Sequence, residues 1–224
     1  MHKIKFYIAI LIFIAQSSIS MAQQQNNTYV SFSKNERELI GNSAEKMEVY
    51  QTTDEKQLHV LQQPSDTVDP KDPLLAILAK RMLATVQDEA HPGVGIAAPQ
   101  VGINKKLIWV QRFDKSGQPF EAYINPKIVW RSTLIRTGAE GCLSIPDRRE
   151  EVERHYAIRI QYANLNGEQK EENVEGFTAV IFQHEIDHLL GILFPDRLDE
   201  QKTNPSQPIV GNPKFSAKEN APRL

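Results

Sequence analysis

The sequence predicts an α+β fold in which antiparallel strands pack around one central helix. Runs typical of strands occupy the stretch 107–174, and an apolar helical pattern follows over residues 174–190. A series of strands that precedes a helix, without regular alternation between the two, indicates the α+β class. The dipeptide Asn166-Gly167 between two strand-like runs is typical of a tight hairpin, so these two strands are expected to run antiparallel.

The first 22 residues have the three parts of a secretory signal peptide. A basic start at His2, Lys3 and Lys5 precedes an apolar run over residues 6–15, and Ser20-Met21-Ala22 resembles a cleavage site. The apolar run is shorter than the ~20 residues of a membrane-spanning helix. We therefore expect export to the periplasm or the medium, with no stable membrane partner after cleavage. An uncleaved N-terminal anchor is the alternative.

The rest of the chain predicts one domain between two polar segments. Residues 23–57 begin with a stretch rich in Gln, Asn and Ser and are expected to form a flexible leader. Residues 58–198 carry the regular apolar patterns, and residues 199–224 are expected to form an irregular polar tail. The formal net charge of −2 at pH 7 offers no basic surface for nucleic acid, so no nucleic-acid partner is expected.

Within residues 58–198 the expected elements follow in order. Residues 58–61 form a short extended piece, and Asp72-Pro73 starts a helix over residues 74–87, because proline suits a first turn. The glycine-rich segment 93–102 is interpreted as a loop that approaches a ligand or a strand closely, since its spacing fits no phosphate-binding motif. The expected strands are residues 107–110, 121–124, 127–130 (after a turn at Asn125-Pro126), 157–162 and 169–174.

The strongest functional signal is the segment Gln183-His184-Glu185-Ile186-Asp187-His188 in the last helix. Positions i and i+4 share one helix face, so both imidazoles can bind one metal ion. The glutamate after the first histidine can then exchange protons with a metal-bound water. The alternative is a pair of surface histidines on an ordinary amphipathic helix. The apolar flanks favour the metal site, because burying these polar side chains without partners is unfavourable.

The chain has a single cysteine, Cys142, which lies in the segment Glu140-Gly141-Cys142-Leu143-Ser144. One thiol cannot form an internal disulfide, so the fold depends on its core alone. A lone cysteine in an exported protein is a buried structural thiol, a partner in an interchain bond, or a residue with a chemical role.

Three segments together resemble those of the peptide deformylase family. They are residues 93–100 (Gly-Val-Gly-Ile-Ala-Ala-Pro-Gln), residues 140–144 and residues 183–188. Enzymes of this family remove formate from N-formylmethionyl peptides. The resemblance extends from Leu58 to Leu198 and implies a deformylase-like catalytic domain built around a metal-binding helix. The chain departs from the family in its export signal, and it lacks the long C-terminal helix of some members.

The resemblance implies a role for each residue of the site. Cys142, His184 and His188 would hold one divalent metal ion, with a fourth position open for water. The family characteristically uses Fe²⁺, and Zn²⁺ is a possible occupant. Glu185 would act as the general acid and base, while the side chain of Gln100 and the backbone N–H of Leu143 would stabilise the oxyanion.

The implied partner is an N-formylmethionyl peptide. Its backbone would pair with Gly95 on one side and with the region around Arg149 on the other. The methionine side chain would lie in an apolar pocket, for which ordinary core packing is the alternative role; its residues would be Val94, Phe177, Val180 and Ile181. Asp187 is expected to orient a metal ligand or to pair with Arg154.

Three alternative functions remain open at the level of sequence. The export signal allows a homologue that acts on other N-acyl peptides. A metalloendopeptidase would also use the motif at residues 183–188, but without a cysteine ligand. A silent module that only binds peptides would not need all the expected ligands together with an acid/base residue.

Overall fold

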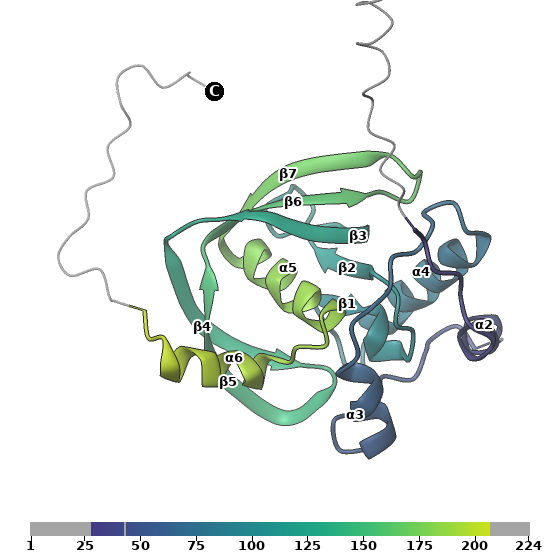
Figure 1. Ribbon diagram of the computed structural model, residues 1–224, viewed down its shortest axis with the longest axis horizontal. Coiled ribbons are helices and arrows are strands. Elements are labelled where there is room, and N and C mark those ends of the chain that lie inside the picture. Colours follow the sequence, from purple (N-terminus) through teal and green to yellow (C-terminus); the bar gives the residue numbers. More distant parts are fainter. Residues whose placement is uncertain (1–27, 43, 207–224) are drawn as a thin grey trace, which may run out of the picture.

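A central helix enclosed by two antiparallel sheets organises the protein. The computed structural model describes residues 28–42 and 44–206. A five-stranded sheet has the order β1-β2-β3-β6-β7, and β4 and β5 form a separate two-stranded sheet. Helix α5 (Gly176–Leu189) lies between these sheets (Figure 1). The predicted α+β class with antiparallel strands around a central helix is therefore confirmed.

The strands and helices follow the chain in a regular succession. The helices other than α5 are α2 (Lys34–Gly41), α3 (Glu55–Leu61), α4 (Pro73–Val86), the 3₁₀ turn η1 (Ala98–Val101) and α6 (Phe194–Thr203). The strands are β1 (Gly95–Ala97), β2 (Leu107–Gln111), β3 (Phe120–Arg131), β4 (Ile135–Cys142), β5 (Ile145–His155), β6 (Ala157–Ala163) and β7 (Gln169–Glu175).

The five-stranded sheet separates two hydrophobic clusters. On β2, Leu107 and Trp109 pack with α4, whereas Ile108 and Val110 pack with α5, because successive side chains of a strand point to opposite faces. Helix α5 ends at Leu189, close to the end of the predicted helical pattern, and Gly191 follows with a φ of +72°, where a Cβ would clash with the carbonyl oxygen of Gln62. Packing against the sheet and the end of the helix near Gly191 together fix the position of α5.

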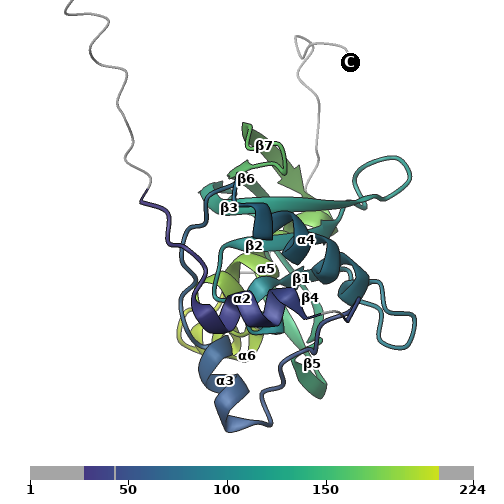
Figure 2. The same ribbon diagram turned by 90° about the vertical axis from the view of Figure 1, so that its right-hand side faces the viewer.

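The expected flexible leader is wrong for the described residues before position 58. Phe32, Ile40 and Met47 are buried in the cluster around α4. The guanidinium of Arg81 on α4 donates to the carbonyl of Leu39 at 2.6 Å, and Figure 2 shows α2 beside α4. These three apolar residues of a polar stretch join the same hydrophobic cluster as the buried side chains of α4, which a compositional argument does not detect.

Two local expectations also differ from the structure. Residues 58–61 belong to α3 rather than to an extended piece, because the Asp54 carboxylate caps the helix by accepting from the backbone N–H groups of Lys56 and Gln57. The expected turn at Asn125-Pro126 is a bulge inside the continuous strand β3. Asn125 adopts a φ of +50°, and its side-chain amide forms two hydrogen bonds with the backbone of Val68.

The segment expected to be an irregular tail begins as a helix. Helix α6 continues to Thr203, and the side-chain oxygen of Gln201 accepts from the backbone N–H of Glu153 on β5 at 2.8 Å. The rest of the tail from residue 207 onward, and the signal segment 1–22, lie outside the described residues. Among the described helices, none is long and apolar enough to cross a membrane.

Candidate metal centre

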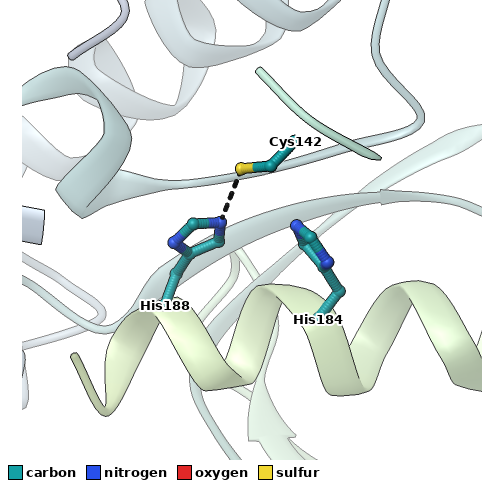
Figure 3. Close-up of side chains that lie close together, drawn as sticks. All are labelled: Cys142, His184 and His188. Carbon is teal, nitrogen blue, oxygen red and sulfur yellow. Dashed lines mark hydrogen bonds between the residues drawn. The ribbon is translucent and has the colours of Figure 1, made fainter. Parts of the chain in front are cut away.

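Helix α5 presents two histidines on one face toward the end of strand β4. His184 and His188 are four residues apart, and their ring centroids lie 5.1 Å apart. Cys142, the last residue of β4, points toward them from the opposite side (Figure 3). Its Sγ lies 3.3 Å from Nε2 of His188, and the three potential ligand atoms lie within 4.8 Å of one another. The three predicted ligands, distant in sequence, therefore meet in space.

The electrostatics of this cluster favour a thiolate beside positive charge. Burial alone would raise the pKa of Cys142, but the imidazoles of His188 and His184 lower it well below the usual value. Burial opposes charge on His184 too, yet its hydrogen bonds with Cys142 and Glu140 raise its pKa well above the usual value. The chain thus pairs a half-buried thiolate with positive charge that a divalent cation could supply instead.

The donor set fits a divalent transition metal. One thiolate and two imidazoles are the ligands that Zn²⁺ and similar ions prefer, and three protein ligands are typical of catalytic sites. The Nδ1 atom of His184 lies 2.9 Å from the Glu140 carboxylate, which leaves Nε2 available as a ligand. This carboxylate–histidine arrangement is the usual support of a metal-binding imidazole.

The Glu185 carboxylate is buried beside this cluster without a full set of partners. Its Oε2 atom has no hydrogen-bond partner within the described chain. Burial raises the pKa of Glu185 to about 7, against the opposing effect of the two imidazoles. A Cβ on Gly95 would clash with the Oε1 atom, so β1 approaches the carboxylate as closely as only glycine permits. An unpaired carboxylate of this kind is suited to moving protons.

The Gln100 side chain is held in one orientation next to Cys142. Its Oε1 atom accepts from the backbone N–H of Ala97 at 2.8 Å, so its NH₂ group is directed to the other side. There Nε2 lies 3.5 Å from the Cys142 sulfur and 3.3 Å from the Ser144 hydroxyl. The amide therefore presents a donor to the cluster, as the predicted role of Gln100 requires.

The loop after Cys142 is fixed by a residue that the sequence did not indicate. The side-chain amide of Gln51 donates to the backbone carbonyl of Leu143 at 3.0 Å. The neighbouring Thr52 donates its backbone N–H to the Ser144 carbonyl at 2.9 Å. No local motif marks Gln51, because its contact spans 92 positions along the chain.

The residues predicted to bind the peptide occupy different environments. Val94 and Phe177 are exposed, and Val180 is half-buried on the same helix as the histidines. Ile181 is only 3 % exposed and belongs to the cluster between α5 and the large sheet. Arg149 is exposed on β5, and its side chain lies next to Gly141.

A chain of four charged side chains supports His184. Arg154 donates to both oxygens of Glu140 at 2.8 and 2.9 Å and also to the Asp187 carboxylate. Burial would raise the pKa of Glu140, but Arg154 and His184 hold it at about 2. The Asp187 carboxylate also accepts from Arg197 on α6. The predicted pairing of Asp187 with Arg154 is present, whereas no local motif indicated the contribution of Arg197.

Replacing Arg197 by alanine is expected to weaken metal binding about tenfold, the lower end of the range for residues that support metal ligands. Asp187 would lose its Arg197 partner and compete with Glu140 for Arg154, which loosens the support of His184. Competition with a chelator measures the affinity. Lys202→Ala on the same helix is the control, because the only ion pair of Lys202 among the described residues is with the exposed Asp199. Equal affinities of both variants would refute the role of Arg197.

Comparison with known proteins agrees with this geometry. The sequence profile described as polypeptide deformylase matches residues 46–204. A peptide deformylase of Phenylobacterium zucineum is 42% identical over 144 residues, which cover 63% of this chain and 83% of that protein. A peptide deformylase of Prochlorococcus marinus is 38% identical over 157 residues, covering 70% of this chain and 75% of that protein.

Solved structures lead to the same family. A class I type b peptide deformylase from Acinetobacter baumannii, with Met-Ala-Ser bound, has a TM-score of 0.61 and 37% identity, covering 68% of this chain and 98% of that one. The peptide deformylase from Thermotoga maritima has a TM-score of 0.61 and 36% identity, covering 68% and 97% of the two chains. With its matched residues spanning all three motifs, the chain belongs to the polypeptide deformylase family.

Proposed function

We propose that the chain is a metal-dependent hydrolase that removes the formyl group from N-formylmethionyl peptides and releases formate. The observation that carries this proposal is the meeting of Cys142, His184 and His188 beside the buried carboxylate of Glu185. Family membership supports the same reaction. The Met-Ala-Ser bound to the Acinetobacter baumannii relative supports a product that begins with methionine.

One divalent metal ion would be held by Cys142, His184 and His188. When bound, such an ion supplies Lewis-acid chemistry, which polarises a carbonyl and lowers the pKa of water. Family resemblance favours Fe²⁺, and the thiolate and imidazole donors also suit Zn²⁺. Metal analysis of protein purified without oxygen distinguishes the two, because Fe²⁺ beside a thiolate is vulnerable to oxidation.

Glu185 would carry the proton during the reaction. Its carboxylate accepts a proton from the attacking water and later gives it to the amine nitrogen as the bond between that nitrogen and the formyl carbon breaks. The unpartnered Oε2 atom supports this role, since it has no competing donor within the described residues. The close approach of Gly95 keeps the carboxylate in a fixed position.

Gln100 and Leu143 would stabilise the negative charge that develops on the formyl oxygen. The fixed orientation of the Gln100 amide supports this proposal, because a donor that needs no rearrangement stabilises the transition state best. The hydrogen bond from the Gln51 side chain to the Leu143 carbonyl restrains the backbone of Leu143, and so the direction of its N–H group. Each such donor typically contributes about 3 kcal/mol.

The peptide would bind as an extended strand beside Gly95 and Arg149. Exposed Val94 and Phe177, together with half-buried Val180, are available to contact the methionine side chain. Ile181 would not contact the methionine directly, because it is buried in the cluster between α5 and the large sheet, where it would support the pocket residues.

We also propose that the protein acts after export, on formyl peptides outside the cytoplasm. The anatomy of residues 1–22 supports this, although the segment lies outside the described part of the structure. Cell fractionation, followed by N-terminal sequencing of the mature protein, tests it. A mature chain that starts near residue 23 and is found outside the cytoplasm is the expected result, and a cytoplasmic chain that retains residue 2 contradicts it.

The main test is formate release from formyl-Met-Ala-Ser by protein loaded with Fe²⁺ or Zn²⁺. Acetyl-Met-Ala-Ser is the parallel substrate, and little turnover of it is expected. Faster cleavage of the acetyl peptide would favour a broader N-acyl hydrolase. Cleavage inside a longer peptide blocked at both ends would favour a metalloendopeptidase, and no turnover of any substrate would refute the proposed reaction.

A further inference from the structure

Leu143 and Ser144 form the two-residue turn between β4 and β5. Cys142 pairs with Ile145 across this turn. The favoured two-residue hairpin turns need a positive φ at one or both central residues, because only then does their twist match that of the strands. Neither turn residue is among the described residues with a positive φ. The turn therefore departs from the favoured geometry, and we expect it to depend on contacts from outside the hairpin.

Two consecutive residues of the segment between α2 and α3 supply such contacts. The side-chain amide of Gln51 donates to the Leu143 carbonyl at 3.0 Å. The backbone N–H of Thr52 donates to the Ser144 carbonyl at 2.9 Å. The carbonyls of both turn residues are thus held by a segment that lies about 90 positions earlier in the chain.

The residue before them holds the 3₁₀ turn η1, which carries Gln100. The backbone N–H of Tyr50 donates to the Gln100 carbonyl at 2.8 Å. On its other side the Gln100 amide donates to the Ser144 hydroxyl at 3.3 Å. Residues 50–52, called the strap below, therefore contact both groups that would stabilise the oxyanion: Gln100 and the backbone of Leu143.

The strap is itself anchored at both ends. Before it, Met47 is buried in the cluster around α4 and donates its backbone N–H to the Thr85 hydroxyl at 2.8 Å. After it, the side-chain oxygen of Gln57 on α3 accepts from the backbone N–H of Gln51 at 2.6 Å. Because both ends are fixed, the strap can impose a defined position on the turn.

The Leu143 side chain is restrained independently of the strap. It packs against the cluster around α4, and its Cδ1 atom would lie 3.0 Å from a Cβ added to Gly93. With the side chain held by the core and the carbonyl held by Gln51, the N–H of Leu143 has little freedom to change its direction.

We propose that the strap sets the distance between the Gln100 amide and the Leu143 N–H, and that Gln51 is a positioning residue of the hydrolysis. The inference rests on the proposed deformylase function. Two donors stabilise an oxyanion best when both already lie in place before the charge develops. Without the Gln51 amide, Cys142 still reaches the metal ligands, but the backbone of Leu143 gains freedom. The loss then falls on the transition state rather than on metal or peptide binding.

The test is Gln51→Met, which keeps the length of the side chain and removes its donor. The kcat for formate release from formyl-Met-Ala-Ser is expected to fall about tenfold, less than the 10²- to 10³-fold loss caused by removing a whole oxyanion donor. KM is expected to stay within about twofold, because an interaction made only in the transition state changes kcat. Metal content should equal that of the wild type.

Gln63→Met is the matched control. Gln63 is exposed, and its side chain forms no hydrogen bond within the described residues, so this variant should behave as the wild type. An unchanged kcat in Gln51→Met, a rise in KM alone, or a loss of metal would each overturn the positioning role. If Gln51→Met does not fold, Gln51→Asn replaces it: its amide is one methylene too short to reach the Leu143 carbonyl, and the same fall in kcat is expected.

A failure of the proposed function would give a different result. In that case the wild-type protein releases no formate, and the strap is tested by amide hydrogen exchange. The Thr52 N–H, which donates to the Ser144 carbonyl, is the reporter. Its exchange is expected to be at least fivefold faster in Gln51→Met and unchanged in Gln63→Met, because losing one bond of the strap promotes local opening. Equal exchange in the two variants would show that Gln51 does not hold the turn.

Discussion

Glu185→Gln is expected to lower kcat for formate release by about 10³-fold while the protein still binds one metal ion. Glutamine keeps the shape of the side chain but cannot accept a proton, and general acid–base catalysis typically contributes about 10²- to 10⁴-fold. Cys142, His184 and His188 remain in place, so metal binding should persist. Single-turnover formate release, together with metal analysis of the same sample, measures both quantities.

Glu175→Gln is the matched control for this experiment. Glu175 directly precedes α5, is exposed and makes no capping hydrogen bond with its side chain, so its amide variant should retain wild-type activity. Activity of Glu185→Gln within a few fold of the wild type would exclude Glu185 as the proton carrier. A loss of activity that accompanies loss of metal would instead indicate a structural role for the buried carboxylate.

The helical part of the site could be predicted from the sequence because its geometry is local. Two histidines four residues apart lie on one face of any α-helix, and the apolar flanks of α5 indicate burial. The position of Cys142 against them depends on the pairing of β4 with β5, and sequence separation carries no information about it. Only the resemblance to a family connected the cysteine to the histidines before the structure did.

Strands β4 and β5 were not predicted because their sequences are mostly polar. Only one side chain of β4, that of Glu140, is fully buried, and it is charged. Its burial becomes understandable once Arg154 and His184 are placed beside it. Strand propensity reflects packing on a half-buried surface, so a strand whose buried residues are paired charges lacks the usual signal.

The support of the site from α6 was missed for a related reason. The sequence of residues 199–206, which includes Gln201, is polar and was expected to be irregular, and no local motif marks Arg197, which lies just before it. Arg197 and Gln201 find their partners on α5 and β5, respectively. The same applies to α2, where isolated apolar residues such as Ile40 become core residues through α4. Long-range partners decided these elements, and composition alone misjudged them.

Cys142→Ala is expected to abolish both metal retention and formate release. The variant loses one of three ligands, so the loss of metal affinity should exceed the roughly 10- to 100-fold effect of changes in supporting residues. The low pKa of the Cys142 thiol, set by the two imidazoles against the effect of burial, indicates that the sulfur is available as a thiolate ligand. Equilibrium dialysis with Zn²⁺ and spectroscopy of the Co²⁺ form, whose thiolate band should disappear, measure the change.

This experiment also separates the deformylase from a metalloendopeptidase. An endopeptidase that used only the motif at residues 183–188 would keep its metal when Cys142 is replaced, because the sulfur would not be a ligand. The deformylase site has no substitute for it: Glu140 is already engaged with Arg154 and His184, and the described residues hold no other group of three potential ligands. The control is wild-type protein from which the metal is removed and then restored, because it shows any damage caused by handling. Full metal binding by Cys142→Ala would show that the meeting of thiol and imidazoles serves another purpose.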